Sequence, residues 1–138
     1  MRFETYDYIT GERLSSQAAE IDLGDIIQGQ HSPQPVVIRA VSDTTAAVSN
    51  LVLYLQSSGG WNVSEFGYYI NSTFVPGVES GSSQMQNRFQ SAGAPPGYDS
   101  TGVPVGWSSG KSHYIWLDAQ IPSDQTGVAD VNFRLTYV

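Results

Sequence analysis

The chain has 138 residues, of which 40% are hydrophobic and 14% charged, and thirteen acids against six bases give a net charge of −7. This length indicates a single domain, and the acidic balance argues against nucleic-acid binding, which requires a basic face. The absence of cysteine excludes disulfides, thiol catalysis and cysteine-ligated metals.

The N-terminal segment, residues 1–17, differs in character from the sequence that follows. We expect it to form an edge strand around Tyr6 and Tyr8, a frayed terminus, or an arm that orders against a neighbouring subunit. Glu4 and Asp7 stand where a secretory signal would need an apolar run, so we expect a protein made in the cytoplasm without a signal peptide. No stretch approaches the roughly 18 apolar residues of a spanning helix, so no membrane partner is expected.

Residues 18–138 carry the patterns of short strands separated by Gly, Pro and Ser. The patterns predict strands at residues 20–24, 35–41, 51–56, 65–70, 73–75, 112–121 and 129–137. Apolar and polar residues alternate throughout the last of these, as in a strand with one buried face and one wet face. About six to eight such strands predict an all-β fold, an antiparallel β-sandwich formed by one domain.

Residues 77–111 form the longest segment without a strand pattern, and they are rich in Gly, Ser and Pro. A loop of this length in a compact domain is usually functional or disordered. Within it, residues 83–89 have the spacing of a short helix, with Met85 and Phe89 on one face.

Residues 21–30 and the β-branched run at 35–39 resemble the opening of many immunoglobulin-like domains. In those domains a strand ending in Asp-Phe-Gly is followed by a glycine turn and a β-branched strand, and here Leu23 replaces the aromatic residue. Residues 48–56 fit the third strand of such a domain. The resemblance implies an immunoglobulin-like sandwich and no particular activity.

The chain as a whole also resembles small structural proteins of tailed-bacteriophage virions, which are often short, acidic, cysteine-free β-sandwiches with an irregular arm. This resemblance implies a capsid decoration protein or another head- or tail-associated component, made in the host cytoplasm and located in the virion. Its implied partners are the major capsid protein or other virion proteins, with self-association as a further option. No functional residue follows from the resemblance, because it lies in overall character and not in a motif.

Catalytic and metal-binding patterns are weak. His31 and His113 lack the spacing of further metal ligands, and Asp22, Asp25 and Asp43 do not form a calcium loop. No serine lies in a Gly-x-Ser-x-Gly turn. We therefore expect a protein without enzymatic activity, cofactor or metal.

Aromatic residues make up 12% of the chain and supply the candidate site residues. Tyr54, Tyr114 and Trp116 fall opposite the aliphatic faces of their strands, where exposed aromatics would mark an interface, together with Tyr6 and Tyr8. In the alternative, the loop at residues 77–111 covers this second face, and Trp116 belongs to a satellite core.

Two further tryptophans, Trp61 and Trp107, lie in Gly/Ser-rich turns. Tryptophans exposed in loops stack on sugar rings, so a carbohydrate-binding module of the adhesin type is the main alternative function. The plain structural alternative is that both indoles close the ends of the sandwich.

Overall fold

The computed structural model describes residues 1–18, 21–44, 47–57, 61–91, 93–124 and 131–136, with residues 57 and 131–136 described through their backbone. Almost all regular structure is β. The strands are β1 (Arg2–Tyr6), β2 (Arg13–Ser15), β3 (Val36–Val41), β4 (Val52–Ser57), β5 (Phe66–Asn71), β6 (Asn87–Arg88), β7 (Val103–Pro104), β8 (Trp107–Ser108), β9 (Lys111–Ser112), β10 (Tyr114–Ala119) and β11 (Val131–Thr136). Two short 3₁₀ helices lie between strands along the chain: η1 (Val63–Glu65) precedes β5, and η2 (Ser83–Gln86) precedes β6.

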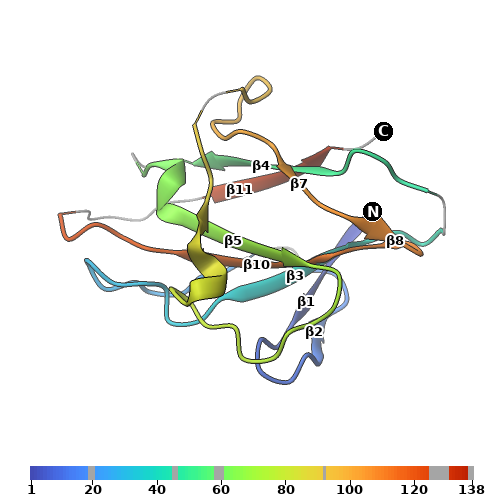
Figure 1. The fold of residues 1–138 in the computed structure, drawn as a ribbon, viewed down its shortest axis with the longest axis horizontal. Helices are drawn as coiled ribbons and strands as arrows, with labels where there is room; N and C mark the ends of the chain where they lie inside the picture. Colours follow the sequence, from blue (N-terminus) through green and yellow to red (C-terminus); the bar gives the residue numbers. More distant parts are fainter. Residues whose placement is uncertain (19–20, 45–46, 58–60, 92, 125–130, 137–138) are drawn as a thin grey trace.

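The strands form two antiparallel sheets that lie one above the other (Figure 1). The larger sheet has eight strands with the path β2-β1-β3-β10-β5-β6; β9 pairs with β3, and β8 pairs with β9. The smaller sheet has the order β11-β4-β7. The strand pairs are antiparallel and lie in two stacked sheets, as in an all-β sandwich. The predicted fold class is therefore confirmed.

The space between the sheets is filled by the main hydrophobic core. Ile38, Phe66 and Leu117 enter it from the larger sheet, and Leu53 and Leu55 enter it from the smaller one. Each of these side chains is at most 2% exposed. Because side chains alternate along a strand, the residues between them on the larger sheet point to its other face, which we call the outer face.

Two predicted strands are wrong. Residues 21–24 turn instead, because the Asp22 carboxylate accepts a hydrogen bond from the Gly24 amide at 2.8 Å and Gly24 adopts a φ of +80°. Residues 73–75 leave the sheet where the Asn71 side-chain amide donates to the Thr73 carbonyl at 2.8 Å. Both segments still bury apolar side chains against the cores.

The helix expected at residues 83–89 is the four-residue η2, and the chain then pairs with β5 as β6. Met85 and Phe89 therefore do not share a face: Met85 packs on the outer face and Phe89 in the main core. The last predicted strand is present as β11, in continuous register with β4. Its predicted alternation of buried and wet side chains lies outside the described residues.

Candidate functional site

The outer face of the larger sheet gathers four of the five aromatics predicted for an interface. The register of neighbouring strands places Tyr6, Val37, Trp116 and Tyr69 in one row across β1, β3, β10 and β5. Tyr114 lies one row away on the same side of β10, and Tyr8 packs against the same cluster. Tyr54 is not part of it, because it lies half-buried on β4 of the smaller sheet.

Trp116 forms the centre of this row and is completely buried within the chain. Its ring lies 5.0 Å from that of Tyr69, 5.8 Å from Phe74 and 6.0 Å from Tyr114, measured between centroids. The residues above it come from the connection that follows β5, where Val78 and Met85 are at most 1% exposed. Trp116 is therefore a satellite-core residue, and it does not offer a surface to a partner.

The N-terminal segment is held on the sheet as a β-hairpin of β1 and β2. The Asp7 carboxylate caps its turn by accepting the amides of Ile9 and Thr10 at 2.8 and 2.9 Å. The turn lies against the segment after β5, since the Gly77 amide donates to the Tyr8 carbonyl at 2.9 Å. Gly11 has a φ of +76° and approaches the Phe74 ring so closely that a Cβ would lie 2.9 Å from it. Use of residues 1–17 as an arm would require this hairpin to detach.

The next row of the outer face is polar and is less covered. It carries Glu4, Arg39, Tyr114 and Asn71 on the same four strands. The Arg39 guanidinium lies 4.0 Å above the centre of the Tyr114 ring, a cation–π contact, and its Nε donates to the Ser112 carbonyl at 2.9 Å. Both side chains are partly exposed, and they combine an aromatic surface with a fixed positive charge.

Glu4 is the buried acid of this row, with 1% of its surface exposed. Tyr6 donates its hydroxyl to Glu4 at 2.6 Å, Arg13 donates at 3.0 Å, and Arg2 lies 3.6 Å away. Burial alone would raise the pKa of Glu4, but the hydrogen bonds from Tyr6 and Arg13 and the charge of Lys111 outweigh it and lower the pKa. Burial, and then the hydrogen bond to Glu4, raise the pKa of Tyr6 to about 12. The Arg-Phe-Glu-Thr-Tyr alternation at residues 2–6 is the sequence signal that would have placed these groups on one face.

Removal of the Tyr6 hydroxyl tests this network. We expect Tyr6→Phe to lower the free energy of unfolding at pH 7 by about 1.5–3 kcal/mol, the range for hydrogen bonds to charged groups. A carboxyl whose pKa is lowered on folding stabilises the protein above its unfolded pKa and loses that effect as the pH falls through the folded value. The deficit of Tyr6→Phe should therefore shrink from pH 7 to pH 3 in urea titrations. An equal deficit at both pH values would contradict the network.

The two loop tryptophans lie against the main core. Trp61 stacks on Phe66 with ring centroids 6.0 Å apart, and Trp107 packs on the core from β8. Both side chains are partly buried, so part of each indole covers the sandwich. The glycan-binding role predicted for them stays a prediction.

A second polar cluster lies at the far end of β10, around the fully buried Asp118. Arg88 donates to Asp118 at 3.2 Å and the Gly81 amide donates at 2.9 Å. Gly81 lies against the His31 ring, so Asp118 ties the loop at residue 81 to the end of the sheet. These contacts engage both carboxylate oxygens of Asp118.

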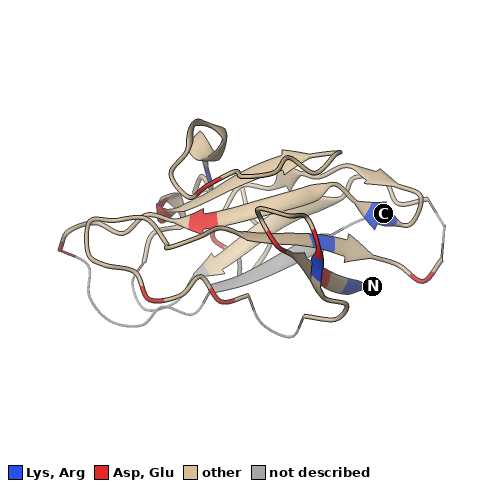
Figure 2. Cartoon of the chain, turned by 90° about the horizontal axis from the view of Figure 1, so that it is seen from below, with Lys and Arg blue, Asp and Glu red and all other residues tan. Residues whose placement is uncertain are grey.

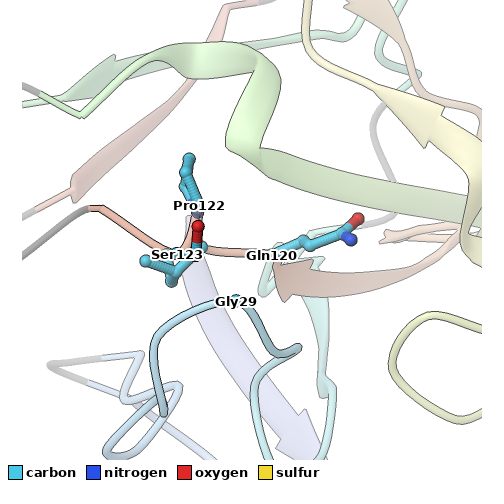
Figure 3. A pocket seen from close by; sticks show the side chains of 5 residues that line it. Gly29, Gln120, Pro122 and Ser123 are labelled. Atoms are coloured by element: carbon cyan, nitrogen blue, oxygen red, sulfur yellow. The ribbon is translucent and has the colours of Figure 1, made fainter.

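A hollow lies just beyond the end of β10. Figure 3 shows a hollow lined by Gly29, Gln120, Ile121, Pro122 and Ser123, none of which is charged. The described residues contain no group of three or more His, Asp or Glu side chains that could hold a metal ion. Within the same residues, no helix is long and apolar enough to cross a membrane.

Comparison of the chain with protein-family models, with curated proteins and with solved structures found no match. Among the described residues, the outer face combines partly exposed aromatic rings with ordered charges.

Proposed function

We propose that this chain is a structural protein without catalytic activity that binds an assembled particle through the outer face of its larger sheet. The observation that carries the proposal is the rim of partly exposed aromatics, Tyr8, Tyr69, Phe74 and Tyr114, around the buried Trp116. Tyrosine and arginine are enriched in protein interfaces, and Arg39 stands on this rim beside Tyr114. The rings are held by packing before any partner arrives, which reduces the entropy lost on binding.

The particle that we propose is the virion of a tailed bacteriophage, with the chain acting as a capsid decoration protein on the major capsid protein. The acidic, cysteine-free composition and the sandwich with a long connection support this proposal. A standard interface buries about 800 Å² per partner. The chain exposes 7472 Å² in total, so one face of the sandwich is large enough to supply it.

Co-sedimentation with phage particles that lack the protein tests the proposal. We expect saturable binding at a fixed copy number. Tyr8→Ser should weaken it about tenfold or more, as truncation of an aromatic hot-spot residue does. Tyr54→Ser is the matched control, because Tyr54 is also a half-buried tyrosine but lies on the other sheet, and it should bind like the unmodified chain.

Each outcome has a distinct meaning. Absence of particle binding would overturn the virion proposal, and equal binding by Tyr8→Ser would overturn the assignment of the surface. Beads coated with glycans serve as the second arm. Retention on them that is lost in Trp61→Ala or Trp107→Ala would favour the carbohydrate-binding alternative instead.

A further inference from the structure

The positive charges of this acidic chain are unevenly placed. Of its six Lys and Arg residues, four lie on adjoining strands β1, β2, β3 and β9: Arg2, Arg13, Arg39 and Lys111. We call these four residues the cationic patch. Figure 2 shows blue segments of this group close together beside the N-terminus, while the acidic segments are spread over the chain.

Several observations place the cationic patch on the outer face beside the aromatic rim. Arg2 and Lys111 are both opposite Val41 in the strand register, and Arg39 is opposite Glu4. Arg2 and Arg13 reach the Glu4 carboxylate, and Lys111 is close enough to act on the charge of that group. The four cations therefore surround one buried acid at the edge of the surface to which the proposed function assigns binding.

Among the described residues, only part of the positive charge of the cationic patch is neutralised by ion pairs. Arg2 and Arg13 are paired with Glu4, and Arg2 also contacts Asp43 at 2.9 Å. Arg39 uses its Nε for the Ser112 carbonyl. Among the described residues, neither the terminal nitrogens of Arg39 nor the exposed ammonium of Lys111 has an ion-pair partner, although the chain carries a net charge of −7.

We propose that the cationic patch docks an acidic segment of the partner protein, with its carboxylates on Arg39 and Lys111 and its apolar side chains on Tyr114. This inference rests on the proposed function and specifies the chemistry of the partner. Charge complementarity supports it: at an ionic strength of 0.15 M the Debye length is about 8 Å, so a local patch governs the contact despite the opposite net charge. The ring under Arg39 adds an apolar surface that a peptide uses and a free anion does not.

The test is a titration followed by NMR, using a short peptide of alternating Glu and Leu, the same peptide with Gln in place of Glu, and inorganic phosphate. We expect saturable shifts at Arg39, Lys111 and Tyr114 with the Glu peptide, and weaker binding as salt is raised. Lys111→Gln should weaken this binding about two- to fivefold, the effect of losing one exposed ion pair. Gln84→Glu changes the net charge equally at an exposed site on η2 and should have no effect.

Three results would overturn the inference. They are equal binding of the Gln peptide, an unchanged affinity in Lys111→Gln, or phosphate shifts as large as those of the Glu peptide, which would mean a site for small anions only. Particle binding separates this inference from the proposed function. If Tyr8→Ser loses particle binding and Lys111→Gln keeps it fully, the result supports binding through the outer face. The same result overturns the docking of an acidic segment on the cationic patch.

Discussion

Trp116→Ala is expected to lower the free energy of unfolding by about 3–5 kcal/mol, the range for truncation of a buried aromatic. The indole is fully buried, and its loss removes the contacts with Tyr69, Phe74 and Tyr114 that join β10, β5 and the covering segment. Urea titration of the purified variant measures the change. Leu14→Ala, at a side chain that is 67% exposed, is the control and should shift stability by no more than about 0.5 kcal/mol.

A milder variant keeps this prediction testable if Trp116→Ala does not fold. The Trp116 Nε1 atom is buried without a hydrogen-bond partner, so Trp116→Phe removes an unsatisfied donor together with part of the ring. We expect it to cost less than half as much as the alanine variant. A loss below about 1 kcal/mol in Trp116→Ala would show that the side chain is not a core residue, and it would return Trp116 to the candidate interface.

Arg88→Met is expected to cost about 3–5 kcal/mol, because it leaves the Asp118 carboxylate buried without its cation. Asp118 is completely buried, and the exposed fraction of the Arg88 side chain is 22%. The pair is packed so closely against β5 that a Cβ at Gly67 would clash with both side chains. Thermal and urea unfolding of the single variants give the size of the loss.

The double variant Arg88→Met/Asp118→Asn separates the charge effect from lost packing. Because it removes both charges and keeps an acceptor for the Gly81 amide, most of the stability should return. Arg13→Met is the comparison at a pair whose arginine is exposed: the Arg13 side chain is 56% exposed, and the buried Glu4 keeps Tyr6 and Arg2 as partners. It should cost about 1 kcal/mol at most. Equal losses for Arg88→Met and Arg13→Met would contradict a buried ion pair.

The sequence predicted the sandwich because its longest strands have strong two-residue periodicity. The run at residues 112–121 had apolar residues on both faces, and β10 indeed contributes Ile115 and Leu117 to one core and Trp116 to the other. The strand expected at residues 20–24 has the same kind of pattern but is too short to outweigh the turn made by Asp22 and Gly24. Local hydrogen bonds that an aspartate carboxylate accepts from nearby backbone amides compete with strand pairing, and the alternation of apolar and polar residues does not reveal them.

The candidate site was predicted in part. Strand alternation placed Tyr114 and Trp116 on one face, but it left open whether that face was covered. The answer depends on contacts between Trp116 and residues some 30 to 40 positions earlier, such as Val78 and Met85, which no local pattern encodes. Strand alternation also placed Tyr54 opposite an aliphatic face, so the sequence predicted it to lie with Tyr114 and Trp116. It lies apart from them because β4 belongs to the smaller sheet and β10 to the larger one. The charged groups around Glu4 come from β1, β2, β3 and β9, and only the pairing of these strands brings them together, which no local pattern predicts.

The connection from β5 to β10 has a consequence for how the chain folds. It runs over the outer face at η2, pairs with β5 at β6, crosses to the smaller sheet at β7 and returns to the larger sheet at β9 (Figure 1). Every one of these pairings joins strands distant in sequence, so the entropy of closing the loops is lost before most contacts form. We therefore expect slow folding, on the scale of milliseconds to seconds. Because the same connection ties both sheets together, they should also come apart in a single step.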